Sequence, residues 1–400
     1  MSTLDARPAP DDTPQLLTIA EPRLLASRSH TVPQRDQDWL VEAAATVRLL
    51  GRGGAAFPVA TKLAAVRRGA RVVVNGSEGE PASWKDRVLM RRYPDLVVAG
   101  AALVGTALRS PQIVIAVGDD QSRAALRAAV RRQSVRIEVR RVEHGFVGGE
   151  VGALMNGLNR RTPVPDGVKV LPHVRGLSGR PTYASNAETF AQLALLSELG
   201  PRGYAAVGTA TEPGTSLLTL HGTERDGVIE VPHGLALRQL LGDQHGPVLI
   251  GGYHGTWSTR TDLVVERPWL REQGIGWGAG VVAVLPDDTC PVGEIARVAR
   301  WLADQSARQC GPCTFGLPTI ATDLERLAAR QPVDADQLRS RLGQVRGRGV
   351  CHHPTGAVGF VASGLDAFAA DVRRHLAGRS CGRPVRGVLP IGAVPIGGPR

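Results

Sequence analysis

The sequence predicts an α/β protein in three parts: a Rossmann-like domain with a parallel sheet, a small β-grasp module and a C-terminal helical bundle. Three patterns predict this order. Short β-branched runs alternate with helical spacing in the first half, which is typical of a parallel sheet. A hairpin pattern then begins near residue 214, and helical spacing dominates from residue 289 to residue 377.

The first domain is expected over residues 36–205, after a flexible arm at residues 1–35 that is rich in Pro, Asp, Arg and Ser. Within this domain, apolar or alternating runs predict strands, and apolar residues three and four positions apart predict the helices between them. The strands are expected at 71–75, 112–117 and 135–142, and the helices at 37–49, 59–68, 95–108 and 121–132.

The β-grasp module is expected over residues 206–275. The runs TSLLTLHG and VIEVPHG, joined by the turn ERDG, predict a hairpin, and a short helix and a strand follow at 234–242 and 248–252. The helical domain is expected over residues 276–378, opening with a strand at 278–288. The Gly/Pro-rich residues 379–400 are expected to form a loose tail.

Composition narrows the class of protein. The 400 residues are 42% hydrophobic, and no apolar run is long enough to span a bilayer. Because the N-terminus lacks a basic segment followed by an apolar one, we expect a soluble, cytoplasmic protein that is peripheral to a membrane at most. The net charge of +11 comes from scattered arginines mixed with acids, and no nucleic-acid-binding motif accompanies them. We therefore expect no nucleic-acid partner.

Residues 51–87 combine a glycine-rich loop, a lysine, a β-branched strand and an acid-rich turn. Glycines let backbone N–H groups approach an anion, a helix start adds positive potential, and a lysine adds a point charge. Only three of the 48 basic residues are lysines, and Lys62 and Lys85 lie here. Arginine cannot replace an ammonium without changing the geometry, so these lysines are either retained for a role or survive by chance. The segment predicts a site for a phosphate-bearing cofactor.

Two further loops lead into helices. HGFVGGEVGALMNGLN at 144–159 follows a predicted strand, and PTYASNAETFAQLALL at 181–196 gives a third loop-to-helix entry. Ligands of open α/β sheets bind outside the carboxyl ends of the strands, and helix N-termini attract anions. Asn186 either caps its helix or faces the same cofactor.

All five cysteines lie in the last third of the chain. An odd number without a signal segment argues against a disulfide framework and favours metal ligation or inert thiols. Cys310-x-x-Cys313 followed by Cys351 has the spacing of an Fe–S or zinc site. A redox CxxC is the rival, but such a motif normally follows a strand, and here we expect it at the end of a helix. His352 or His353 could be a fourth ligand.

Taken together, these motifs resemble the flavin-bearing NADH dehydrogenase subunit of respiratory complex I and the related subunits of soluble hydrogenases and formate dehydrogenases. That family typically reads GRGGAGFP followed by a lysine, NADEGEPGTFKDR, a GEE-containing glycine loop, GLxGKPTxxNNVET, a β-grasp module and SCGKCTPCREG with a late cysteine. The likeness covers roughly residues 40 to 375 in the same order. It implies an FMN domain, a β-grasp domain and a helical bundle that holds a 4Fe–4S cluster.

The resemblance also implies roles for particular residues. Glu80 and Glu150 would serve the reaction, Glu80 beside the nicotinamide and Glu150 below it. Phe57 would face the nicotinamide nucleotide. The residues that would bind the flavin are Gly51, Gly53, Gly54, Lys62, Asn75, Glu78, Gly148, Gly149 and Asn186. The cluster would be held by Cys310, Cys313 and Cys351.

Several positions depart from the family pattern. An acidic residue is replaced by Ser77, a glutamate by Val151, a tyrosine by Phe146 and an asparagine by Ser185, while Ala65 and Leu171 stand where the family places aromatics around the adenine. The choice between NADH and NADPH therefore stays open. Ala307 replaces one cluster cysteine, which leaves three thiolates. They could hold a 3Fe–4S centre, a 4Fe–4S cluster completed by a histidine, Cys290 or solvent, or no cluster.

The resemblance implies an NADH dehydrogenase-type oxidoreductase that oxidises NAD(P)H through FMN. Electrons would pass through the Fe–S cluster to a partner protein, such as a ferredoxin or a small Fe–S subunit, or to a quinone-reducing complex. The alternative is a degenerate paralogue that keeps the fold as a scaffold or binding module without turnover.

Overall fold

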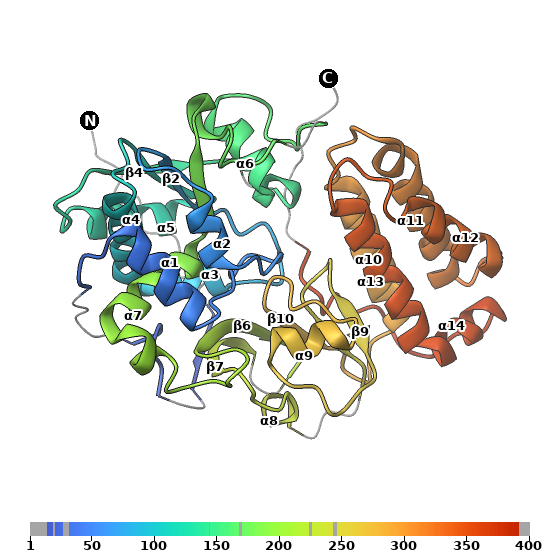
Figure 1. Cartoon of the computed structure of the whole chain (residues 1–400). Helices are drawn as coiled ribbons and strands as arrows, with labels where there is room; N and C mark the ends of the chain where they lie inside the picture. Colours follow the sequence, from blue (N-terminus) through green and yellow to red (C-terminus); the bar gives the residue numbers. More distant parts are fainter. Residues whose placement is uncertain are drawn as a thin grey trace, which may run out of the picture.

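The computed structural model describes residues 14–18, 21–26, 32–143, 145–167, 170–223, 226–242 and 246–391. Figure 1 shows three neighbouring parts, which follow one another along the chain: a sheet covered by helices, a second sheet, and a group of helices at the C-terminal end. The predicted α/β class with a parallel sheet is confirmed. The predicted boundaries between the parts stay predictions.

The first sheet is fully parallel, with the strand order β4–β3–β2–β5. Asn75, at the end of β2, pairs with Ala116 of β3 on one side and with Asn186 of β5 on the other. Two asparagines therefore lie side by side at the carboxyl end of the sheet. The strands are β2 (Arg71–Gly76), β3 (Ile113–Val117), β4 (Ile137–Arg141) and β5 (Thr182–Asn186).

Alternation along β2 places helices on both faces of this sheet. Val72 and Val74 share one core with most of the helices, whereas Val73 packs in a second core with α6. Asp36 and Asp119 cap α1 and α5 by accepting hydrogen bonds from backbone N–H groups at 2.8 Å. The helices are α1 (Gln37–Thr46), α2 (Val59–Ala64), α3 (Lys85–Arg92), α4 (Pro94–Ala107), α5 (Asp120–Val130), α6 (Val151–Leu158) and α7 (Ala187–Tyr204), with 3₁₀ turns η1 (Val147–Gly149) and η2 (Leu177–Gly179).

The second sheet is mixed, with the order β1–β7–β6–β10–β8–β9. The predicted hairpin forms its centre as β6 and β7, with β10 parallel to β6 and antiparallel to β8. Its elements are β1 (Leu16–Leu17), β6 (Thr215–His221), β7 (Gly227–Pro232), α8 (Arg238–Leu241), β8 (Val248–Ile250), β9 (Thr256–Ser258), α9 (Arg267–Glu272) and β10 (Val281–Val284).

This second sheet joins the other two parts. One face has its own core, which includes Leu218 and Val282. On the opposite face, Leu217 packs into the core of the first sheet, and Val281 packs into the core of the C-terminal helices. The strand expected at 278–288 at the start of the helical domain is therefore shorter and belongs to this sheet, because its edge hydrogen bonds are made by β6 and β8.

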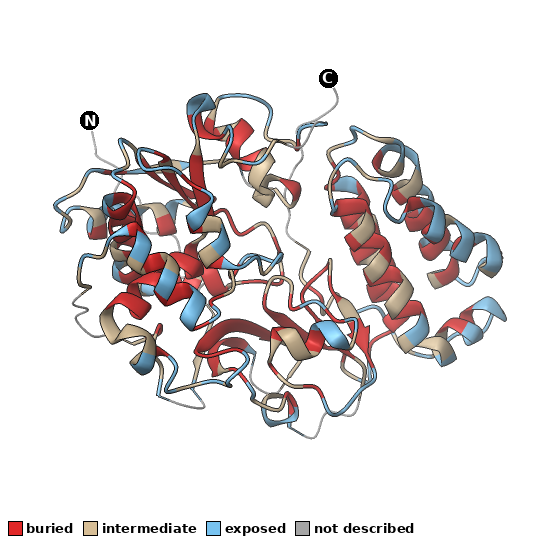
Figure 2. Ribbon diagram, in the orientation of Figure 1, coloured by how far each residue is buried: buried red, intermediate tan, exposed pale blue. Residues whose placement is uncertain are grey.

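The C-terminal helices are α10 (Pro291–Asp304), the π-helix η3 (Pro312–Gly316), α11 (Leu317–Ala328), α12 (Ala335–Val345), α13 (His353–Ala367) and α14 (Ala369–Leu376). Figure 2 shows buried residues along α10, whereas α12 and α14 are more exposed. Their cores are satisfied within this group and against the second sheet. No helix among the described residues is long and apolar enough to cross a membrane.

Both chain ends are more ordered than expected where the structure describes them. In the expected arm, β1 pairs with β7, and the N–H groups of Leu24 and Leu25 donate to the Glu230 carboxylate at 2.8 and 3.1 Å. In the expected loose tail, the N–H of Gly387 donates to the Glu294 carboxylate at 2.6 Å. In each case a buried carboxylate in a distant element binds several backbone N–H groups, which local composition does not reveal. Residues 1–13 and 392–400 lie outside the described part.

Three further elements differ from the sequence analysis. The run at 181–196 begins with a strand, β5, rather than a loop, and residues 85–92 form helix α3 where a turn was expected. The Cys310-x-x-Cys313 motif opens a helix rather than ending one, because α10 stops at Asp304 and η3 begins at Pro312. Pro312 favours this position because proline needs no N–H partner in the first turn of a helix.

Candidate functional site

The first glycine loop, residues 51–57, lies over the carboxyl end of the parallel sheet although it precedes β2 in the chain. The N–H of Gly51 donates to the Phe57 carbonyl at 2.9 Å, which closes the loop. A Cβ added to Gly53 would lie 3.5 Å from Cβ of Asn186, at the end of β5. The loop therefore reaches the sheet edge where Asn75 and Asn186 meet.

The tip of this loop offers backbone donors. Gly53, Gly54 and Ala55 are exposed, and within the described structure their three N–H groups have no hydrogen-bond acceptor. Successive free N–H groups next to a helix start form a concave site for an anion. This geometry fits the phosphate of a nucleotide-type cofactor. Phe57, at the end of the loop, has 49% of its surface exposed and offers a flat apolar face.

Lys62 stands in the last turn of α2, behind the loop. Its ammonium donates to the carbonyl of Ala184 in β5 at 3.0 Å, and burial lowers its pKa. Since a lysine ammonium has three N–H donors, donors remain for a ligand at this edge of the sheet. The structure thus brings Lys62 close to β5, as a cofactor role requires.

The second glycine loop, which includes Gly148 and Gly149, packs backbone to backbone on the end of β2. The side-chain amide of Asn75 donates to the Gly149 carbonyl at 3.0 Å, and a Cβ on Gly149 would lie 3.2 Å from the Ser77 carbonyl oxygen. Only glycine leaves room for this approach. Asn186 caps α7 by accepting from the Glu188 N–H at 3.0 Å, so the capping interpretation is confirmed.

Glu78 serves the fold. Its carboxylate accepts from the N–H groups of Asp86 and Arg87 at the start of α3, both at 3.1 Å, and from Ser83 Oγ at 2.5 Å. Burial favours the neutral form, but Arg87 and the N–H donors outweigh it, so the pKa of Glu78 is lowered. An ionised Glu78 therefore holds α3 in place, and its predicted contact with the flavin stays a prediction.

Glu80 has the opposite electrostatic environment. It accepts from the Tyr253 N–H at 2.8 Å, and burial raises its pKa to about 7. A carboxyl group that titrates near neutral pH can accept or release a proton under cellular conditions, which is typical of functional acids. Glu80 is thus the carboxyl group of the predicted site best suited to proton transfer.

Glu150 links the glycine loop to the cysteines. It caps α6 by accepting from the N–H groups of Gly152 and Ala153 at 2.7 and 2.9 Å. Its charge is also close enough to Cys351 to raise the pKa of that thiol, together with burial. The predicted reaction role of Glu150 stays a prediction.

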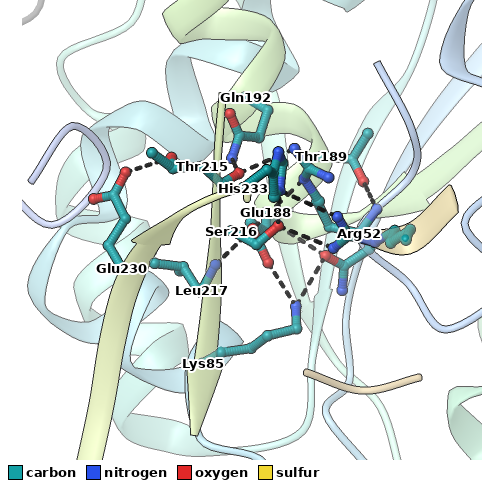
Figure 3. A network of polar contacts seen from close by, with 12 residues as sticks. Arg52, Lys85, Glu188, Thr189, Gln192, Thr215, Ser216, Leu217, Glu230 and His233 are labelled. Carbon is teal, nitrogen blue, oxygen red and sulfur yellow. Dashed lines mark hydrogen bonds and ion pairs between the residues drawn. The ribbon is translucent and has the colours of Figure 1, made fainter. Parts of the chain in front are cut away.

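A buried ion network beneath the glycine loop was not predicted as a site (Figure 3). The Lys85 ammonium lies 2.8 Å from Asp86 Oδ1 and 3.0 Å from Glu188 Oε2, and the Lys85 and Glu188 side chains are only 4% and 1% exposed. Arg52, inside the loop, pairs with Glu188 at 3.7 Å and with Glu212 at 3.4 Å. The retention of Lys85 among so few lysines was the one sequence signal for it.

This network fixes the loop to its surroundings. The N–H of Arg52 donates to Thr189 Oγ1 at 2.9 Å, and its guanidinium donates to the Thr215 carbonyl at 3.0 Å. Glu188 accepts from the Leu217 N–H at 3.1 Å. The loop, α7 and β6 are therefore held together by buried charges and their hydrogen bonds, which preorganises the donors at the loop tip.

The three predicted cluster ligands lie together at the other side of Glu150. Cys313 is buried, and burial and the thiols of Cys310 and Cys351 raise its pKa to about 12. Ala307 lies in the preceding loop and supplies no ligand. Three adjacent thiols on two separate segments fit an iron–sulfur centre, because thiolates are the ligands such clusters need.

The candidates for a fourth ligand separate clearly. Both ring nitrogens of His353 are engaged, with the Leu302 carbonyl at 2.9 Å and with His254 at 3.0 Å, and burial lowers its pKa to about 4. His353 is therefore a neutral structural residue. Cys290 precedes α10, at the opposite end of the helix from the motif. His352 is exposed beside Cys351, which leaves His352 or solvent.

An aromatic group connects the second glycine loop to the cysteine region. The Phe146 ring lies 4.6 Å from His254, 5.2 Å from Trp301 and 5.6 Å from His353, measured between ring centroids. Its N–H also donates to Gln305 at 3.4 Å. The loop that contacts Asn75 at one end is thus packed on the cysteine-bearing helices at the other.

Two family descriptions match the chain over these two regions. Residues 44–195 match the Nuo51 FMN-binding domain, and residues 294–375 match the NADH-ubiquinone oxidoreductase-F iron-sulfur binding region. The first range contains all three loops, and the second contains the three clustered cysteines.

Curated relatives match along most of the length. The second of two NADH-quinone oxidoreductase F subunits of Rhizobium meliloti is 27% identical over 379 residues, covering 86% of this chain and 90% of the relative. The corresponding F subunit of Mycobacterium tuberculosis NADH-quinone oxidoreductase is 28% identical over 376 residues, covering 83% of each.

Solved structures agree with this match. A chain of an air-oxidized NAD+-reducing NiFe-hydrogenase has a TM-score of 0.82 at 26% identity, over 92% of this chain and 68% of that one. In the H2-reduced state, the TM-score is 0.76 at 26% identity, over 87% of this chain and 63% of the other. The present chain thus spans 63% to 68% of the length of that hydrogenase chain.

Proposed function

Because the chain belongs to the family of NADH-quinone oxidoreductase F subunits, we propose that it is an electron-transfer flavoprotein subunit that oxidises NAD(P)H through FMN and passes the electrons to an iron–sulfur cluster. The relatives are NADH dehydrogenase-type oxidoreductases. The proposal transfers this activity to the present chain.

One observation carries the proposal: a single loop, residues 145–150, contacts both candidate sites. At its end Gly149 accepts from Asn75 at 3.0 Å, and at its start Phe146 packs on Trp301. Glu150 lies close enough to Cys351 to raise the pKa of its thiol. Such contiguity is what single-electron transfer between a flavin and a cluster needs.

The residues around the first loop fit FMN. The free N–H groups at 53–55 would bind the phosphate, Lys62 would add a positive charge, and Asn75 and Asn186 would lie along the bound flavin. Phe57 would stack on the nicotinamide nucleotide, and Glu80 would hold or release a proton near neutral pH. When bound, FMN converts a two-electron donor into one-electron steps.

The cluster would be held by Cys310, Cys313 and Cys351. With Ala307 in place of a fourth thiol, the centre is a 3Fe–4S cluster or a 4Fe–4S cluster whose fourth iron takes His352 or solvent. The helix N-terminus at η3 and the N–H donors around Cys351 would stabilise the thiolates.

The electron acceptor is proposed by chemistry. The relatives are subunits of larger assemblies, so the partner is another protein subunit. We propose a ferredoxin or a small Fe–S subunit, or entry into a quinone-reducing complex. A one-electron carrier that docks near the cysteine-bearing helices would fit this proposal.

The test is cofactor content. The full chain is purified anaerobically with iron and FMN supplied, and flavin absorbance, iron and acid-labile sulfide are measured. The expected result is both cofactors, with flavin bleaching on addition of NADH or NADPH, which also decides between the two nucleotides. Absence of flavin and sulfide would support the scaffold alternative. Flavin without iron would leave a two-electron flavoprotein.

A further inference from the structure

A second group of metal-ligating side chains lies in the C-terminal region, away from the cysteines assigned to the cluster. It consists of Cys290, His375 and Cys381, whose Sγ and ring nitrogen atoms all lie within 4.8 Å of one another. Cys290 and His375 are buried, and Cys381 is partly exposed. Neither the iron–sulfur motif nor the proposed function uses these residues. We propose that they form a tetrahedral zinc site.

The geometry matches zinc. Zinc–sulfur bonds of about 2.3 Å and zinc–nitrogen bonds of about 2.0 Å at tetrahedral angles place a sulfur and a nitrogen ligand about 3.5 Å apart. Cys290 Sγ and His375 Nε2 lie 3.6 Å apart. Two soft thiolates and one imidazole are a donor set that zinc takes in proteins, and the two negative charges balance the ion. Because Cys381 is partly exposed, water can fill the fourth position.

The histidine is already oriented as a ligand. Its Nδ1 lies 3.0 Å from the Leu327 carbonyl oxygen, to which it donates a hydrogen bond. A proton on Nδ1 leaves the lone pair on Nε2, the atom that faces Cys290, free for a metal. A carbonyl–imidazole pair of this kind fixes the ring and the tautomer in many metal sites.

The site lies where three separate segments meet. Cys290 precedes α10, His375 lies in the last turn of α14, and Cys381 begins the final segment. The Cys290 N–H donates to the Pro384 carbonyl at 2.8 Å, so the same segments already touch there. An ion at this point would join the end of the chain to the helical core.

The proposed site is distinct from the iron–sulfur region. Cys290 and the Cys310 motif flank α10 at opposite ends, and a helix of 14 residues is about 21 Å long. Zinc at one end and a cluster at the other therefore share no ligand. Each can be removed by substitution without touching the other.

The experiment uses this independence. The full chain, with its cluster reconstituted anaerobically, is exchanged against zinc and desalted, and zinc per chain is measured by plasma mass spectrometry. We expect one zinc ion in the wild type. We expect its loss in Cys290→Ser/Cys381→Ser, and its retention in the matched control Cys310→Ser/Cys313→Ser. Cobalt in place of zinc should give a thiolate charge-transfer band that follows the same pattern.

A single substitution and an unmodified chain guard against misfolding. His375→Gln should lose the zinc, and zinc should raise the unfolding temperature of the wild type but not of His375→Gln. The proposal is overturned if the wild type takes up no zinc, if zinc persists without His375, or if peptide mapping after alkylation finds a Cys290–Cys381 disulfide.

Discussion

Replacing Lys85 by methionine should destabilise the domain that carries the glycine loops. The Lys85 ammonium lies 2.8 Å from Asp86 and 3.0 Å from Glu188, and 3.5 Å from Asn186 Oδ1. Methionine fills similar space but leaves two buried carboxylates without this cation. Breaking a buried ion pair costs about 3–5 kcal/mol. Glu188 keeps Arg52 at 3.7 Å and the Leu217 N–H, so we expect a loss near the lower value, about 3 kcal/mol.

The loss should grow with pH. Burial already raises the pKa of Asp86 to about 6 in the wild type, even beside Lys85. Without the ammonium this pKa rises further, because the burial is no longer offset by that cation. A carboxyl group whose pKa is raised by folding favours the folded state at low pH, and this contribution is lost as pH rises through the folded pKa. The gap between variant and wild type should therefore be small near pH 5 and largest above pH 7.

The assay is urea unfolding followed by circular dichroism at several pH values, with hydrogen exchange in α3 and α7 to locate the effect. Lys62→Met is the matched control, since the Lys62 ammonium donates to a carbonyl and its loss costs about 1 kcal/mol. A loss in Lys85→Met below about 1 kcal/mol, or one independent of pH, would show that this ion pair does not hold the domain together.

Three further predictions concern the proposed cofactors and their surroundings. Lys62→Ala should weaken FMN binding by roughly tenfold, because a charge-assisted contact to the cofactor is lost, and fluorescence titration of the flavin-free chain measures it; unchanged affinity would remove Lys62 from the site. Glu80→Gln should abolish a loss of stability that the wild type shows as pH rises from about 4.5 through 7, worth up to about 3 kcal/mol, in unfolding experiments at both ends of that range; a wild type equally stable at both would contradict the raised pKa. Cys313→Ser should lower bound iron to background while FMN stays bound, and Cys381→Ser should leave iron unchanged; colorimetric iron and flavin absorbance report both, and full iron in Cys313→Ser would exclude it as a ligand.

Much of the fold follows from local patterns. The β-branched runs at 71–75 and 112–117 and the hairpin at β6 and β7 form as predicted, because alternating or continuous apolar residues bury only as strands of those lengths. β5 was missed because its residues, Thr182–Asn186, include polar side chains that are buried only between β2 and the helix that follows. Helix α3 was missed because its first turn is held by Glu78, outside the helix.

The candidate site divides in the same way. The glycine loops, Lys62 and the Cys310 motif carry spacing that the sequence displays directly. The roles of Glu78 and Glu150 as helix caps depend on which N–H groups point toward them, and spacing does not show this. The network of Arg52, Lys85 and Glu188 joins segments more than 100 residues apart in the chain.

The family, the kinds of cofactor and the three thiols could be identified from the linear chain, because they depend on residue types at short spacings. Three-dimensional contacts were needed to show which carboxyl groups hold helices in place, that Glu80 titrates near neutral pH, and that both nitrogens of His353 are engaged. The same contacts bring Cys290 to His375 and Cys381. Burial, hydrogen-bond partners and charge pairing arise where distant segments meet, and a linear pattern does not contain those meetings.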